Sequence, residues 1–150
     1  MEPSVKRIAL LLVLVAACKT VVVRDPNMTG AGDPRATVAR FLAAAKAQDI
    51  QALGAMYGNE KGARRDQDPR PLIERQLLIQ LQCLRHDTAV ISDAKRGEGG
   101  RQIFTVDFTQ GTNKASVQFT TVKGPSDRWY VEVFEITVLQ NKGFCGKSGS

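Results

Sequence analysis

Residues 101–123 read RQIFTVDFTQGTNKASVQFTTVK, and this stretch decides the fold. Its apolar residues alternate with polar ones in both halves, at Phe104, Val106 and Phe108 and then at Ala115, Val117 and Phe119. An alternation of period two is typical of a strand that buries one face. Gly111 and Thr112 separate the halves, and so short a connection requires antiparallel neighbours. The stretch therefore predicts two antiparallel strands that share one buried face.

Two flanking stretches, residues 88–95 and 128–139, are also rich in Val, Ile, Thr and Phe. Turn-forming residues separate them from the central pair, GEGG at 97–100 and GPSD at 124–127. Together the four stretches predict a four-stranded antiparallel meander, with strands over residues 88–95, 101–110, 113–123 and 128–139.

The residues before the sheet predict three helices. Asp33 and Pro34 are typical of an N-cap and a first helical residue, and they open the first helix. Asp49 caps a second helix over 50–57, which Gly58 is placed to end. Residues 59–70 are charged and loop-like, and a third helix is expected over 72–84. One apolar stripe marks the first helix, at Val38, Phe41, Leu42 and Ala45.

This order of elements predicts an α+β fold in which three N-terminal helices cover one face of the sheet. Two stretches, AKAQDIQALGAMYG at 45–58 and DRWYVEVFEI at 127–136, resemble the first helical hairpin and the last long strand of NTF2-like, cystatin-like proteins. The resemblance covers about residues 33–139 and implies a curved four-stranded sheet wrapped round the long helix, with a cone-shaped cavity. It is closest to small bacterial lipoproteins of this superfamily, which mostly lack an assigned activity.

The N-terminal segment has the pattern of an export signal. Lys6 and Arg7 precede an uncharged apolar run over residues 8–17, about half of the ~20 residues needed to span a bilayer. A signal peptide fits this length better than a transmembrane helix does. The run ends in VAAC at 15–18, which resembles the lipobox of bacterial lipoproteins: a branched apolar residue, two small residues and a cysteine.

The lipobox resemblance implies that Cys18 becomes the first mature residue. Its sulfur would carry diacylglycerol, and its new amine would carry a fatty acyl chain such as palmitate. Two or three chains together anchor firmly, whereas one is marginal. Ordinary secretion remains the alternative, because Val15 and Ala17 also suit the usual cleavage pattern. In Gram-negative lipoproteins an Asp directly after the cysteine favours retention in the inner membrane. This chain has Lys19 there, so we expect the protein in the cell envelope at the outer membrane, facing the periplasm.

These features divide the chain into four parts. We expect a signal peptide over 1–17, a lipidated N-terminus and tether over 18–32, an NTF2-like domain over 33–145 and a flexible tail over 146–150.

The cysteines predict one disulfide. The chain has three, and lipidation of Cys18 leaves Cys83 and Cys145. Export places these two in an oxidising space, where pairing is favoured. Inert thiols and a catalytic thiol with His86 are the alternatives. No metal site is expected, because the paired spacing that tetrahedral zinc prefers is missing.

The candidate site residues come from the cone that the resemblance implies. Enzymes of this fold place an Asp or His base and a Tyr there, which makes Asp107, His86 and Tyr57 the candidates. The alternation of Asp107 with Val106 and Phe108 directs it to water, so no catalytic residue is assigned. No cofactor fingerprint is visible, and no cofactor is expected. The candidates for lining a ligand pocket are Phe41, Tyr57, Phe119 and Trp129.

The chain has 21 Lys and Arg against 15 Asp and Glu, a modest basic surplus. The basic cluster over 61–70 is diluted by Asp66 and Asp68 and lacks interleaved aromatics, so a nucleic-acid partner is not expected. The sequence favours a membrane-anchored envelope lipoprotein whose noncatalytic domain binds a small apolar ligand or a protein. An isomerase or hydratase and a structural assembly module are the alternatives.

Overall fold

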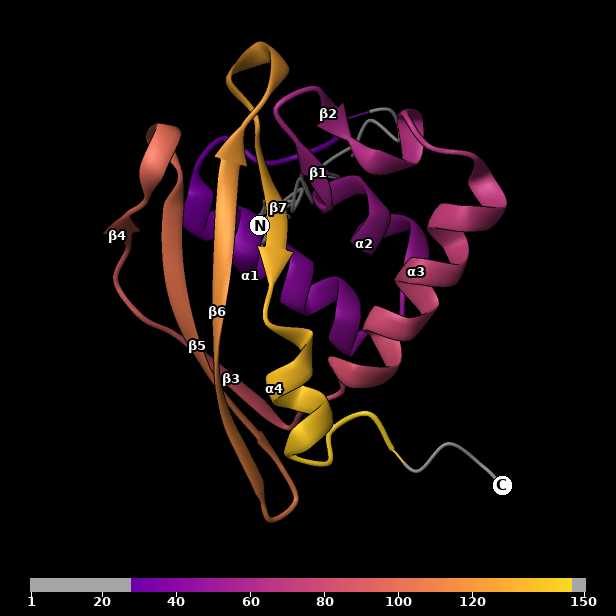
Figure 1. The fold of residues 1–150 in the computed structure, drawn as a ribbon, viewed down its shortest axis with the longest axis vertical. Coiled ribbons are helices and arrows are strands. Elements are labelled where there is room, and N and C mark those ends of the chain that lie inside the picture. Colours follow the sequence, from indigo (N-terminus) through magenta and orange to yellow (C-terminus); the bar gives the residue numbers. More distant parts are fainter. Residues whose placement is uncertain (1–27, 147–150) are drawn as a thin grey trace, which may run out of the picture.

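The computed structural model describes residues 28–146 (Figure 1). The predicted signal peptide, the lipobox with Cys18 and most of the predicted tether lie outside the described residues, as do residues 147–150. Across residues 28–146, no helix combines the length and the apolarity that crossing a bilayer requires.

Three helices precede the main sheet in the chain: α1 (Pro34–Lys46), α2 (Ile50–Met56) and α3 (Arg70–Cys83). The side chain of Asp33 caps α1 by accepting a hydrogen bond from Ala36 N at 2.8 Å. Asp49 caps α2 by accepting from Gln51 N and Ala52 N, each at 3.0 Å. Both caps are the ones that the sequence predicts, because an aspartate there satisfies amides that the helix leaves unpaired.

The central pair of strands is confirmed as β5 (Gln102–Gln110) and β6 (Asn113–Lys123). Their register places Phe104 opposite Phe119 and Val106 opposite Val117, so the predicted alternation shares one buried face. β3 (Thr88–Ile91) and the two-residue β4 (Lys95–Arg96) pair with one side of β5, while β7 (Trp129–Phe134) pairs with β6. The order is β3-β5-β6-β7, with β4 also on β5, and all of these pairings are antiparallel.

The predicted loop over 59–70 contains structure of its own. A small hairpin forms from β1 (Gly58–Asn59) and β2 (Gly62–Ala63), and the 3₁₀ turn η1 (Arg64–Asp66) follows it. Two further 3₁₀ turns, η2 (Glu98–Gly100) and η3 (Pro125–Asp127), lie in the predicted turns of the sheet. Two-residue strands carry too little periodicity to be read from the sequence.

The predicted last strand is too long. β7 ends at Phe134, and residues that were expected to extend it form α4 (Ile136–Asn141). In a continued strand, Leu139 would lie on the face opposite Phe134 and would be exposed, because faces alternate. In the helix Leu139 is fully buried. α4 packs against β6, whose residues 113–118 precede the part that pairs with β7.

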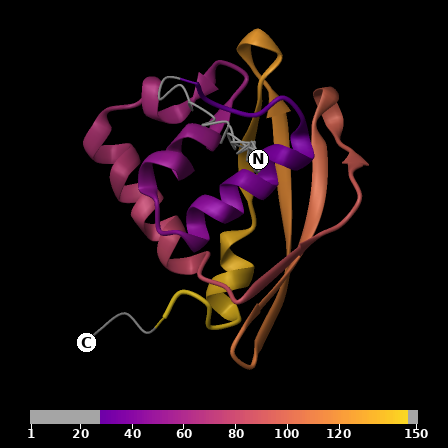
Figure 2. The ribbon, with the colours of Figure 1, turned by 180° about the vertical axis from the view of Figure 1, so that it is seen from behind.

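The helices and the sheet form two layers. In Figure 1 α1 passes behind the strands and α3 lies to the right of β7, and in Figure 2, turned by 180°, α1 crosses the sheet in front. The opposite face of the sheet carries exposed residues, among them Val90, Asp107 and Val133. The prediction of an α+β domain is confirmed, with two corrections. The sheet has five strands rather than four, and the helices are not confined to the N-terminal part, because α4 follows β7.

The core between the layers is built from phenylalanines. All six in the chain are buried, and none is more than 7% exposed. Phe119 of β6 stacks on Phe134 of β7 with ring centroids 5.0 Å apart and an interplanar angle of 9°. Phe41 of α1 and Phe108 of β5 each contact Phe119 at 6.1 Å. Phe119 is therefore the point where the helical layer meets the sheet.

We expect Phe119→Ala to lower the free energy of unfolding by about 3–5 kcal/mol, because it removes a fully buried ring and leaves a cavity. The measurement is urea unfolding followed by circular dichroism. Val133→Ala is the matched control, because Val133 lies in the same sheet but is 55% exposed. A Phe119→Ala loss no larger than that of Val133→Ala would contradict the central position of this ring.

Gly58 has a packing role that differs from the predicted one. α2 already ends at Met56, and Tyr57 is extended at φ −88° and ψ 121°, so Gly58 is not needed to end the helix. A Cβ atom at Gly58 would lie close to the carbonyl oxygen of Gly62 across the small hairpin and 2.7 Å from the ring of Tyr130. Tyr130 is only 3% exposed, so its ring has little room to move. The close approach of the small hairpin to Tyr130 therefore requires glycine.

Gly58→Ala should lower the free energy of unfolding by about 1–3 kcal/mol through overpacking. Gly32→Ala is the control, because nothing lies within 4 Å of the Cβ it would add. Thermal unfolding of both variants separates the two effects. Equal melting temperatures would show that the hairpin moves away from Tyr130 without cost.

Candidate functional site

Two of the four residues predicted to line a ligand pocket belong to the phenylalanine core. Phe41 and Phe119 are both fully buried, and each contacts further rings of the phenylalanine core. Trp129 lies apart from them at the start of β7, half-buried, where its carbonyl accepts from Thr37 Oγ1 at 3.1 Å. Tyr57 lies at the end of α2. The four predicted pocket residues are therefore distributed over the core and its margin.

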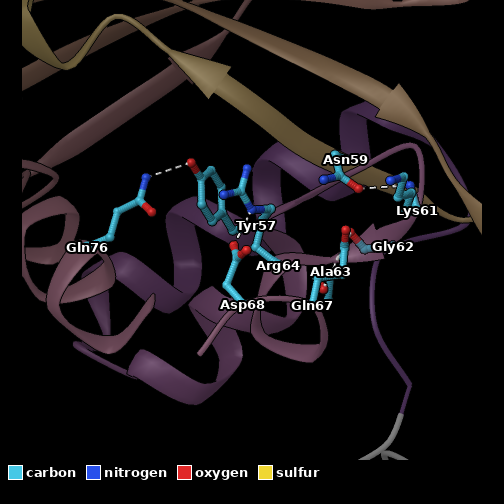
Figure 3. A network of polar contacts seen from close by, with 9 residues as sticks. All are labelled: Tyr57, Asn59, Lys61, Gly62, Ala63, Arg64, Gln67, Asp68 and Gln76. Carbon is cyan, nitrogen blue, oxygen red and sulfur yellow. Dashed lines mark hydrogen bonds and ion pairs between the residues drawn. The ribbon is translucent and has the colours of Figure 1, made fainter. Parts of the chain in front are cut away.

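Tyr57 is 8% exposed and its hydroxyl accepts a hydrogen bond from Gln76 Nε2 of α3 at 2.9 Å (Figure 3). Its backbone carbonyl accepts from Arg64 N at 3.0 Å, and its backbone also bridges to Val131 of β7. These contacts tie α2, α3 and β7 together. They give Tyr57 the role of a core residue with one polar partner.

Asp107 and His86 lie on different sides of the sheet. Asp107 is exposed on the outer face, where Ser116 Oγ of β6 donates a hydrogen bond to it. His86 is half-buried on the inner side, with its ring 5.5 Å from that of Phe108. Its Nδ1 lies 2.7 Å from the carbonyl oxygen of Leu84, and since a carbonyl only accepts, Nδ1 carries the proton. The structure does not bring these two candidates together with Tyr57.

The buried polar side chains of residues 28–146 are all neutral: Thr37, Gln80 and Thr121. Thr37 donates to backbone carbonyls of Asp33 and Trp129, and Thr121 donates to that of Gln102. Gln80 Oε1 has no hydrogen-bond partner. Proton transfer inside a protein uses an ionisable group held in a desolvated place. Within the part of the chain that the structure describes, the tyrosines Tyr57 and Tyr130 are buried, but no carboxylate, histidine, lysine or arginine is, and no three potential metal ligands cluster.

Cys83 and Cys145 lie at disulfide distance, with their sulfur atoms 2.15 Å apart. Cys83 ends α3, and Cys145 lies in the segment that follows α4. The pair joins positions 62 residues apart in the chain. Phe144, directly before Cys145, is 1% exposed and contacts Phe108 at 6.2 Å, so the segment after α4 closes the lower end of the core.

The first described residues are held firmly on the domain. Ala31 exchanges two backbone hydrogen bonds with Trp129, at 3.0 and 2.8 Å, and Gly30 N donates to Ala55 O at 2.8 Å. The guanidinium of Arg128 donates to the carbonyls of Thr29 and Gly30 at 3.0 and 2.6 Å. We call residues 29–31 with these contacts the N-terminal clasp. It fixes the point at which the preceding chain reaches the domain.

An open depression lies beside the clasp, and we call it the entry depression. Its volume is about 380 Å³. Its floor includes Tyr130, whose hydroxyl lies 2.9 Å from Thr29 Oγ1. The lining is mixed in character, and it comprises Met28, Thr29, Lys61, Gly62, Ala63, Asp66, Pro125, Ser126, Arg128 and Tyr130.

The small hairpin that borders the entry depression is braced by its own polar groups, as Figure 3 shows. Gln67 Nε2 donates to the carbonyls of Gly62 and Ala63 at 2.8 and 3.1 Å. Asn59 Oδ1 accepts from Lys61 N at 2.8 Å, and Arg64 Nε lies 2.5 Å from Asp68 Oδ2. The bonds made by Gln67 and Asn59 satisfy backbone groups that two-residue strands leave unpaired, and the Arg64–Asp68 pair joins two side chains of the segment that follows.

A charged cluster on the outer side joins three elements. Arg101 contacts both carboxylate oxygens of Glu132 in β7, at 2.6 and 2.7 Å, and Glu60 of the small hairpin at 3.1 Å. The hydrogen bonds and charge of Glu132 raise the pKa of Arg101, so this guanidinium stays charged. The pairing of Glu132 with Arg101 depends on the strand register, which no local pattern in the sequence contains.

A second open depression of about 400 Å³ lies at the turn end of β5 and β6. Asp107 and Ser116 line it together with Lys114 and with Lys142, which follows α4. Neither depression is lined by Phe41, Tyr57, Phe119 or Trp129. The two depressions are therefore lined by surface residues and not by the residues predicted to line a pocket.

Comparison of the chain with protein-family models, with curated proteins and with solved structures finds no match. A function for this chain therefore has to follow from its own residues and geometry.

We predict that Cys83 and Cys145 form a disulfide after export. Protein from an oxidising compartment, unfolded without reductant, should take up no alkylating label at either cysteine, and reduction should release both. In chain-entropy models a loop of 62 residues gains about 4 kcal/mol from the bond, so the Cys83→Ala, Cys145→Ala double variant should unfold at lower denaturant. Two thiols that alkylate without reduction would contradict the prediction.

Proposed function

We propose that the chain is a lipid-anchored protein of the bacterial cell envelope whose α+β domain acts through its surface. The anchor rests on the order of basic Lys6 and Arg7, the apolar run over 8–17 and the lipobox that ends at Cys18. These residues lie outside the described part, so the anchor remains an inference from the sequence.

The filled interior is the observation that carries the second half of the proposal. Phe119, the expected lining of a cone, is instead enclosed by Phe41, Phe108 and Phe134. A core packed in this way supports a role as a binding or assembly module. The helical pair α1 and α2 against an antiparallel sheet supports the NTF2-like resemblance, which belongs to the same proposal with its cone closed by side chains.

The N-terminal clasp gives the anchor a mechanical consequence. Only nine residues lie between Cys18 and Met28, and an extended chain covers at most about 3.4 Å per residue, so the ten steps from one to the other span at most roughly 34 Å. Because the clasp bonds the chain to β7 from Thr29 onward, the domain has little further slack. A lipid on Cys18 would therefore hold the domain close to the membrane, with the entry depression on the side of attachment.

A small apolar ligand is the second candidate, and the entry depression is the place it would occupy. Its volume of about 380 Å³ is at the lower end of the range for small-molecule sites. The isomerase or hydratase alternative lacks comparable support. Asp107 lies on the outer face of the sheet, and Nδ1 of His86 donates its hydrogen bond to the carbonyl oxygen of Leu84. The proposal therefore favours binding of a protein partner over catalysis of an isomerase or hydratase reaction.

We expect Cys18→Ala to abolish lipidation and either release the protein from membranes or leave the signal peptide attached. The measurement is expression in a Gram-negative host with a radiolabelled fatty acid, followed by fractionation and intact mass. Thr20→Ala is the control, because it changes a residue near the cysteine without touching the lipobox. A Cys18→Ala protein that is cut normally and stays with the membrane would overturn the anchor.

A further inference from the structure

The outward side of α3 carries an apolar surface that nothing in the described domain covers. Leu72 is 60% exposed, Leu78 is 58% and Ile79 is 49%. They are three of the six large hydrophobic side chains that are exposed among residues 28–146. Residues seven apart lie on the same side of a helix, two turns from each other, so Leu72 and Ile79 share one side of α3. Leu78 lies at the edge of that side. We call Leu72, Arg75, Leu78 and Ile79 the outer face of α3.

The same helix buries a full stripe on its other side, at Ile73, Leu77 and Leu81. Packing of α3 on the core is therefore complete without the outer face. A helix that is apolar on both sides is usually enclosed on both sides. We therefore expect the exposed apolar side chains of the outer face to be buried against a second apolar surface, outside the described domain.

The charges around the outer face are mostly positive, with Glu74 as the one acidic residue of the helix. Arg75 lies between Leu72 and Leu78 and has no ion pair among residues 28–146. Arg70, at the start of the helix, pairs with Glu74 at 2.7 Å, and Arg85 follows its end. Residues 70–85 thus hold three arginines and one glutamate. Exposed leucine and isoleucine next to arginine can contact the acyl boundary and the headgroups of an anionic bilayer at the same time.

We propose that the outer face of α3 lies on the membrane, with its apolar side chains at the acyl boundary and its arginines among anionic phospholipid headgroups. This inference rests on the proposed lipid anchor and names the surface that the anchored domain presents to the bilayer.

The point of attachment agrees with this orientation. Met28 lines the entry depression together with Asp66 of η1, which lies four residues before α3 begins. Met28 is itself an exposed apolar side chain, at 56%. The anchored chain therefore reaches the domain near the start of α3. A tether of roughly 34 Å confines the face to a thin layer above the lipids, so a weak intrinsic affinity suffices.

A second copy of this chain fits the outer face less well. A two-fold axis through the middle of the apolar set would place Arg75 close to Arg75 of the second copy, with no acidic residue of the outer face to neutralise them. Phospholipid phosphates neutralise the same charge. The sign of Arg75 therefore favours a lipid surface over a dimer.

The test is the depth of a single nitroxide label on the lipidated, processed protein. With Cys18 lipidated and the other two cysteines paired, Leu78→Cys adds the one reactive thiol. Wild-type protein treated with the same nitroxide reagent should take up no label, which confirms that no other thiol reacts. The protein is reconstituted in vesicles of phosphatidylcholine with 30% phosphatidylglycerol. Collisions with oxygen, which concentrates in lipid, are compared with collisions with a water-soluble nickel chelate. Val90→Cys is the matched control, because Val90 is 63% exposed on β3, in the sheet.

We expect residue 78 to be shielded from nickel and accessible to oxygen, while residue 90 shows the reverse. Arg75→Glu in the labelled protein should lower the membrane-facing population by about fivefold or more, since one basic residue at an anionic surface contributes about 1 kcal/mol. Arg40→Glu, the same charge change at an exposed site on α1, should leave it unaltered.

Three outcomes would overturn the inference, and they are distinguishable. If the protein does not float with the vesicles, the proposed lipid anchor is wrong. A protein that floats while residues 78 and 90 are equally exposed to nickel keeps the anchor and loses the α3 contact. Rapid disulfide cross-linking of Leu78→Cys in detergent, with strong label–label coupling, would assign the outer face to a second copy.

Discussion

The stacking of Phe119 on Phe134, with Phe41 and Phe108 against its other edges, is the contact on which the domain depends. It joins α1, β5, β6 and β7 at one buried point. Aromatic side chains bury large areas and add favourable ring geometry, so a single ring in this position stabilises both layers at once. The curved sheet, the helix across it and the closing segment at Phe144 all meet the same group of rings.

Filling the interior has a functional consequence. A cone that holds a ligand or a catalytic carboxylate needs empty volume or a buried charge, and here the rings occupy the space. What the domain offers is its exterior: the N-terminal clasp and entry depression near residue 28, the charged cluster of Arg101 with Glu132, and the outer face of α3.

Two features show why the candidate site was harder to predict than the fold. Asp107 could be assigned to the outer face from its alternation with Val106 and Phe108, a local pattern. Whether Phe119 lined a cavity or a packed core depended on how closely Phe41, Phe108 and Phe134 approach it, and no local pattern contains those distances. The pairing of Arg101 with Glu132 likewise depends on the β-bulge between β6 and β7.

By itself the sequence determined the local structure: the aspartate caps of α1 and α2, the antiparallel hairpin of β5 and β6, and the α+β class. These follow from forces that act over a few residues, namely capping hydrogen bonds, period-two burial and short turns. Tertiary structure alone decided that residues 136–141 form a helix, that Gly58 is required by Tyr130, and that α3 is apolar on a side the core does not use. Each of these depends on which distant segment packs alongside, because burial is a property of the assembled chain.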